Sequence, residues 1–87
     1  MKNLFLIENT DTFCGEPNYV WVRRVYVRAT TPRGAISKAR KHWACGGKIR
    51  KTADYGDMIR WNVDGAAICY FCTKIDESQI NIAIEVI

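Results

Sequence analysis

Long apolar runs are missing from this sequence. None of its 87 residues lies in an apolar stretch approaching the ~20 residues of a membrane-spanning helix. Residues 4–7 are the only apolar stretch before Glu8, whereas a signal peptide needs a longer stretch and a cleavage site of small residues. Tandem repeats, low-complexity tracts and Gly/Ser linkers are missing as well. We therefore expect a single domain over residues 1–87, located in the cytoplasm.

Signatures of catalysis are also missing. The chain has one histidine, His42, and no Ser/His/Asp or Cys/His pairing can be argued from position. Neither a P-loop nor a dinucleotide-binding fingerprint occurs. Asp54, Asp57 and Asp64 fall on predicted turns. We therefore expect a protein that is not an enzyme and has neither catalytic residues nor a cofactor.

The four cysteines are Cys14, Cys45, Cys69 and Cys72. In a cytoplasmic protein, cysteines are more often free thiols or metal ligands than partners in disulfides. Cys69 and Cys72 have zinc-ligand spacing, and two ligands from among Cys14, His42 and Cys45 could complete a tetrahedral site. The strand predicted below, however, places Cys69 and Cys72 on opposite faces. We expect no metal site, Cys72 in the core and Cys69 half-exposed, with a structural zinc domain as an alternative.

Periodicity and turn residues predict the secondary structure in outline. A helix is expected over residues 32–44, because a Thr can cap it and Pro32 suits its first position. Gly46 and Gly47 would end it in the left-handed conformation. Its apolar face would hold Ala35, Ile36, Ala39 and Trp43. The strands expected from β-branched and aromatic residues lie at 3–7, 19–29 (with a bulge at Arg23-Arg24), 48–51 and 80–87.

Asp64-Gly65 predicts a hairpin with a two-residue type I′ turn between Met58–Val63 and residues 66–73. That turn would place Trp61 opposite Ile68 and Ile59 opposite Tyr70. The apolar face of the hairpin would then be Ile59, Trp61, Val63, Ala66, Ile68, Tyr70 and Cys72. We expect an α+β fold in the order β-β-α-β-β-β: one small domain with a mostly antiparallel, four- to five-stranded sheet and one amphipathic helix on one face.

The charges are segregated along the chain. Residues 23–53 hold ten Lys or Arg and no acidic residue, whereas residues 1–22 have a net charge of −2 and residues 54–87 of −4. An uninterrupted basic segment predicts binding to a polyanion. We expect a surface for nucleic acid, a nucleoprotein complex or an acidic protein, made of Arg24, Tyr26, Arg28, Arg33, Lys38, Arg40, Lys41, Lys48, Arg50 and Lys51.

Part of this segment has a distinctive pattern of residues: Val25, Val27, Ala29, Thr30, Thr31, Ala35, Ile36, Ala39 and Arg40, followed by Cys45, Gly46, Gly47, Ile49 and Arg50. This pattern resembles small phage-encoded inhibitors of type I CRISPR complexes. The resemblance implies a compact αβ protein without enzymatic activity that binds a guide-RNA-loaded complex in the host cytoplasm. The resemblance implies that the residues in contact with this complex are Arg33, Lys38, Arg40 and Lys41.

Residues 80–87 offer an alternative function. Their alternating apolar side chains predict a strand that would lie at an edge of the sheet. An exposed edge strand can pair with its counterpart in a second copy. A protein-interaction module that forms a homodimer through this edge is therefore a second hypothesis.

Overall fold

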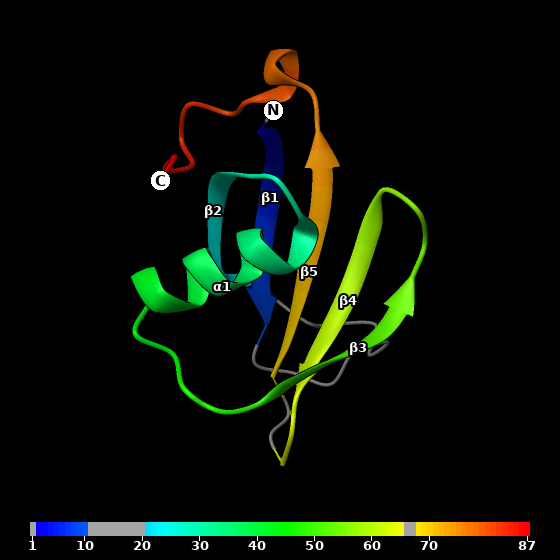
Figure 1. Cartoon of the computed structure of the whole chain (residues 1–87). Helices are drawn as coiled ribbons and strands as arrows, with labels where there is room; N and C mark the ends of the chain where they lie inside the picture. The colour runs from blue at the N-terminus through cyan, green and yellow to red at the C-terminus, as the bar shows by residue number, and fades with distance from the viewer. Residues whose placement is uncertain (1, 11–20, 66–67) are drawn as a thin grey trace.

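The computed structural model describes residues 2–10, 21–65 and 68–87. Within them, five strands form one antiparallel sheet in the order β2-β1-β5-β4-β3, and a helix lies across one face (Figure 1). The predicted α+β class is confirmed, with five strands. The elements are β1 (Asn3–Thr10), β2 (Trp21–Ala29), α1 (Pro32–His42), β3 (Ile49–Asp54), β4 (Met58–Val63), β5 (Cys69–Ile75) and the 3₁₀ helix η1 (Glu77–Gln79).

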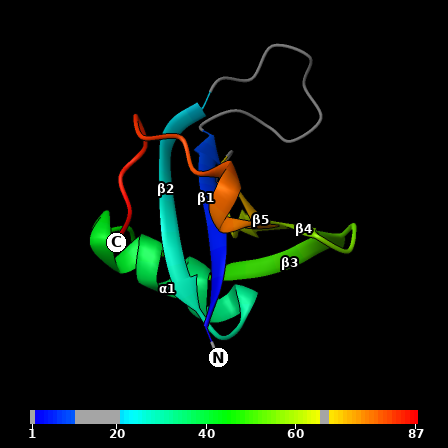
Figure 2. The ribbon, with the colours of Figure 1, turned by 90° about the horizontal axis from the view of Figure 1, so that it is seen from above.

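The core lies between α1 and the sheet. Ala35, Ile36 and Ala39 are buried on the underside of the helix, because their spacing brings them to one face. They pack mainly against β2, β1 and β5, where Ile7 and Val25 are fully buried. The β3–β4 hairpin projects sideways beyond α1 (Figure 2). The helix therefore covers only part of this face of the sheet.

The β4–β5 hairpin has a register that differs from the prediction by two residues. Trp61 lies opposite Tyr70, and Ile59 lies opposite Cys72. Val63 donates its N–H to the Ile68 carbonyl at 3.1 Å, so the connection is longer than the predicted two residues. Because side chains alternate with a period of two, the shift leaves every residue on its predicted face. The apolar face is therefore confirmed for the described residues, while Ala66 lies outside them.

The bulge in β2 lies slightly before its predicted position. Asn9 pairs with Arg23 and Thr10 pairs with Trp21, so the extra residue is Val22 and not the Arg23-Arg24 pair.

The strand predicted at residues 80–87 does not form. After η1 the chain makes a turn, and Val86 forms an isolated parallel bridge with Tyr26. Tyr26 donates its N–H to the Glu85 carbonyl and accepts from the Ile87 N–H, both at 2.8 Å. Ile82 is 99% exposed, so the apolar alternation does not correspond to a buried face. The prediction of an edge strand at residues 80–87, on which the homodimer hypothesis depended, is therefore wrong.

The helix ends two residues earlier than predicted. Trp43 is its C-cap, and Ala44 (φ 54°) adopts the left-handed conformation that was expected of a glycine. An L-residue pays about 1–2 kcal/mol for that conformation. With 11 residues, α1 is short, and no helix in the described ranges is long and apolar enough to span a membrane.

Ala44→Gly is therefore expected to stabilise the fold by about 0.5 kcal/mol, because relief of backbone strain exceeds the extra entropy that glycine gains on unfolding. Gly47→Ala should do the opposite and destabilise it by more than about 1 kcal/mol. Gly47 has φ +95°, and its added Cβ would lie 3.1 Å from a Val63 methyl group. Urea denaturation of the two variants measures both signs, and a destabilising Ala44→Gly would contradict the helix end described here.

Candidate functional site

The basic segment is divided between the two faces of the sheet. By strand register, Arg24, Arg28 and Arg50 lie on the face away from α1. Each of them meets a carboxylate: the partners are Glu8 at 3.0 Å, Glu77, and Asp64 at 3.8 Å, respectively. Burial raises the pKa of Glu8, and the nearby Arg24 guanidinium opposes that rise. On this face the predicted cations are already neutralised within the chain.

Tyr26 is not a surface residue. It is 3% exposed, and its hydroxyl accepts a hydrogen bond from the Asn81 N–H at 2.9 Å. The C-terminal segment therefore covers it, and the prediction that Tyr26 contributes to a binding surface is wrong.

The face that carries α1 holds a second set of positive charges. We call Arg23, Arg33, Lys38, Lys41 and Lys51 the helix-side cations; all five are exposed. Strand register places Arg23 and Lys51 on this face, because they lie opposite Asn9 and the core residue Trp61. Lys51 lies 3.7 Å from Asp54, but the other four have no carboxylate within ion-pair distance among the described residues.

Two further lysines, Lys48 and Lys74, are exposed. Lys48 is exposed in the connection between α1 and β3, again without an ion pair to any described residue. Lys74 is exposed and lies opposite the buried Phe5, which places it on the face that carries α1. Arg23 and Lys74 were not among the predicted site residues. The charge of Arg23 within the basic segment was visible, but no sequence signal pointed to Lys74.

Three arginines on this face lie over aromatic rings. The guanidinium carbon is 5.9 Å from the ring centre in the Arg23–Trp43 pair. The distance is 5.5 Å from Arg33 to Trp61 and 5.6 Å from Arg40 to Tyr70. Such contacts fix the guanidinium group without neutralising its charge. Arg23 and Arg33 are therefore presented to solvent as oriented cations.

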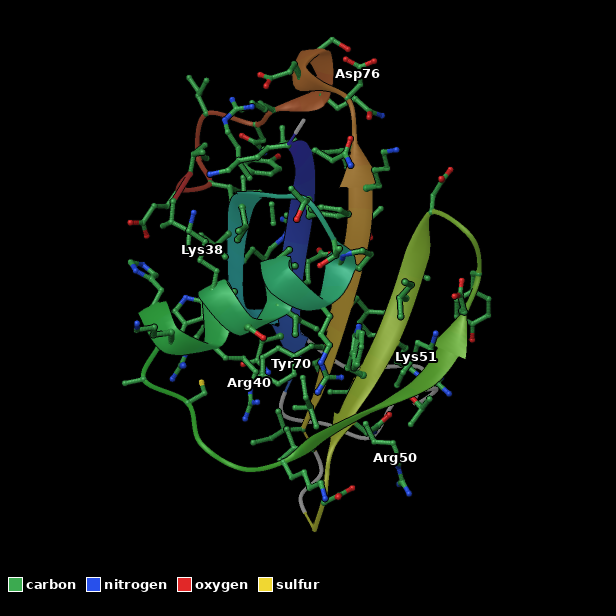
Figure 3. The ribbon with its side chains drawn as sticks, viewed as in Figure 1. Lys38, Arg40, Arg50, Lys51, Tyr70 and Asp76 are labelled. Carbon is green, nitrogen blue, oxygen red and sulfur yellow. The ribbon has the colours of Figure 1, made fainter. Side chains whose placement is uncertain are left out.

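Arg40 has a structural role. It is half-buried, and its Nη2 donates to the carbonyl oxygens of Gly46 at 2.7 Å and Gly47 at 2.6 Å. Lys38 and Arg40 leave α1 on opposite flanks, and Arg40 extends toward Tyr70 beneath the helix (Figure 3). The prediction that Arg40 belongs to the exposed cationic face is wrong, because this side chain holds the α1–β3 connection.

A pocket of about 310 Å³ lies beside Tyr70 and the α1–β3 connection. Arg23 donates from Nη1 to Cys45 Sγ at 3.2 Å at this site. Burial, followed by a hydrogen bond with Cys45, raises the pKa of Tyr70, so its hydroxyl is neutral at physiological pH. The pocket is lined by Asn9, Arg23, Cys45, Gly46, Val63, Ile68 and Tyr70.

The cysteines do not form a metal site in the described part of the chain. Cys69 takes part in a disulfide and is fully buried, so the predictions of a free sulfur and of half-exposure are wrong for it. Cys72 is a free thiol in the core, as predicted, and strand register confirms that it faces away from Cys69. Cys14 lies outside the described residues. No group of three or more His, Cys, Asp or Glu gathers within those residues, and His42 instead contacts Glu85 at 3.3 Å.

Burial raises the pKa of Cys72 to about 12, which predicts a thiol that is unreactive in the native state. At about pH 8, iodoacetamide should alkylate the half-exposed Cys45 at least about 10³-fold faster than Cys72, as followed by peptide mass spectrometry. In denaturant the two rates should converge. The folded state holds this proton more tightly than the unfolded one, so stability should fall as pH rises from about 9 toward 12. Rapid native labelling of Cys72 would contradict its burial.

Comparisons of the chain with protein-family models, with curated proteins and with solved structures find no match.

Proposed function

We propose that this chain is a non-enzymatic binding module for nucleic acid and that it binds through the helix-side cations. The observation that supports this best is the contrast between the two faces of the sheet. On the face away from α1, the predicted site arginines are paired with carboxylates, whereas four of the five helix-side cations have no such partner in the described ranges. Unpaired cations gain the most from phosphate, since they displace its counterions.

The arginines favour nucleic acid over an acidic protein surface. Arg23 and Arg33 rest on tryptophan rings, which orient the planar guanidinium group. A guanidinium group matches the paired oxygens of a phosphate and can also stack on a base. Carboxylates would satisfy only the first of these interactions. We therefore take the phosphate backbone as the ligand.

Fluorescence anisotropy with labelled single-stranded and duplex DNA tests the proposal. Binding should weaken linearly on a log–log plot between about 50 and 200 mM salt, with a slope of about −3.5 for single strands if all five cations contact phosphate. No binding to either DNA at low salt would overturn the proposal. Competition by polyglutamate as effective as competition by DNA would assign the surface to acidic proteins instead.

A guide-RNA-loaded defence complex is one nucleic-acid partner that fits this surface. The resemblance to phage-encoded CRISPR inhibitors suggests it, and Arg33, Lys38 and Lys41 would carry the contact. We do not include Arg40 among these contact residues, because its guanidinium group binds the carbonyl oxygens of Gly46 and Gly47. A type I complex that binds its target DNA equally well with and without this protein would exclude such inhibition.

If the partner is a guide-RNA-loaded defence complex, the protein acts in the cytoplasm. Disulfides are rare in that compartment. A cytoplasmic protein would therefore be expected to hold Cys69, which is disulfide-bonded in the structure, in its reduced form.

A further inference from the structure

We propose that the pocket beside Tyr70 binds one unstacked base of a single-stranded nucleic acid, with Arg23 at the adjoining phosphate. The inference rests on the proposed function and deepens it by naming single strands as the preferred ligand. The pocket volume of about 310 Å³ is at the lower end of the range for small-molecule sites, about 300–1,000 Å³. It therefore suits one nucleotide and not a longer folded segment.

The lining of the pocket matches the chemistry of a base. Val63 and Ile68 from the β4–β5 hairpin supply aliphatic wall for the flat faces of the ring. The Asn9 amide supplies hydrogen-bonding groups for its polar edge. Asn9 Nδ2 makes its contacts with the carbonyls of Thr10 and Cys69 at 3.4 Å, which is long for a hydrogen bond, so a ligand can compete for it.

Charge at the pocket favours a phosphate beside the bound base. None of the lining residues is acidic, and Tyr70 stays neutral because burial disfavours its ionised form. The exposed Arg23 guanidinium is held between the Trp43 ring and Cys45 Sγ, so it is oriented before a ligand arrives. Register places this arginine among the helix-side cations, on the face proposed to track the backbone.

The pocket predicts a preference for single strands. Bases in a duplex are stacked and paired, so flipping one out of the duplex costs free energy. The cost is lower in a single strand, where the bases are already unpaired. A backbone-binding surface alone would favour the duplex, which has the higher charge density. The presence or absence of bases on a single strand therefore separates this inference from simple phosphate binding.

The first test compares oligothymidine with an abasic strand of equal length and charge. The native protein should bind oligothymidine about tenfold more tightly, since contacts to a base add to those with phosphate. Oligothymidine should also protect Cys45, which lines the pocket, from iodoacetamide, whereas the abasic strand should not. Equal affinity and equal protection would overturn the base pocket and leave nucleic-acid binding intact. No binding of either strand at low salt would overturn both proposals.

The second test fills the pocket. Gly46 lines it and has an ordinary backbone conformation, and an added Cβ would meet none of the described atoms within 4 Å. Gly46→Trp should therefore fold and reduce the preference for oligothymidine to less than about twofold, while Gly46→Ala, the matched control, keeps the tenfold preference. Binding of the abasic strand should be equal in both variants. A preference that survives in Gly46→Trp protein would overturn the assignment of the base to this pocket.

Discussion

Replacing Lys38, Lys41 and Lys51 together by glutamine is expected to weaken binding to single-stranded DNA by about 10²–10³-fold at about 50 mM salt. Each lysine that leaves a phosphate costs slightly less than tenfold at that salt concentration, because one set of counterions is no longer released. The slope of log affinity against log salt should become shallower by about 2. These lysines are exposed on α1 and β3, so the fold should tolerate the change.

The matched control is the triple variant Lys2→Gln, Arg28→Gln and Arg50→Gln. It removes the same three positive charges, but from the exposed N-terminus and from the face away from α1. Long-range electrostatics alone should weaken its binding by less than about fivefold, since screening acts over about 10 Å. Equal losses in the two triple variants would mean that net charge, and not the helix-side surface, determines affinity.

Local features of the fold could be predicted from the sequence. The Thr31 hydroxyl accepts the Gly34 N–H at 3.0 Å, and the apolar stripe centred on Ile36 is buried. Both depend on residues within one or two helical turns, where stereochemistry alone decides. The end of the helix was harder to predict from the sequence, because Ala44 adopts a conformation for which glycine is the better residue.

Features set by contacts distant in sequence could not be predicted. Asp64-Gly65 favours a tight turn, but β5 also pairs with β1, so the hairpin must satisfy two neighbouring strands at once. At the C-terminus, alternating apolar residues resemble a strand. Asp76 and Gln79 instead form a capping box that begins η1, and the following segment pairs with β2 through a single bridge between Val86 and Tyr26.

The candidate site shows the same division. Sequence located the positive charge, and alternation along β2 correctly grouped Arg24 with Arg28. Their partners Glu8 and Glu77 come from other elements, so only the folded arrangement shows that these arginines are neutralised. The position of Lys74 follows from its cross-strand neighbour in the same way. Charge along the chain predicts a polyanion site, while strand register shows which cations share a face and could contribute to such a site together.

Arg40 shows most clearly how a cation with a structural role differs from the cations proposed to bind nucleic acid. Arg40→Met is expected to lower the free energy of unfolding by about 2–3 kcal/mol, because the charge-assisted hydrogen bonds to Gly46 and Gly47 and the stacking on Tyr70 are lost together. Part of that loss is offset, since Arg40 Nε is buried without a hydrogen-bond partner among the described residues. Methionine keeps most of the apolar stem in place.

Urea denaturation of Arg40→Met and of Lys41→Met, its neighbour on α1, measures the contrast. Lys41 is exposed, so its replacement should change stability by less than about 0.5 kcal/mol while weakening DNA binding slightly less than tenfold at about 50 mM salt. Arg40→Met removes the same charge, and for a domain of this size its loss of stability corresponds to a decrease in Tm of about 10 °C or more. If Arg40→Met instead left stability unchanged and weakened binding as Lys41→Met does, Arg40 would belong to the binding surface, as its position in the basic segment first suggested.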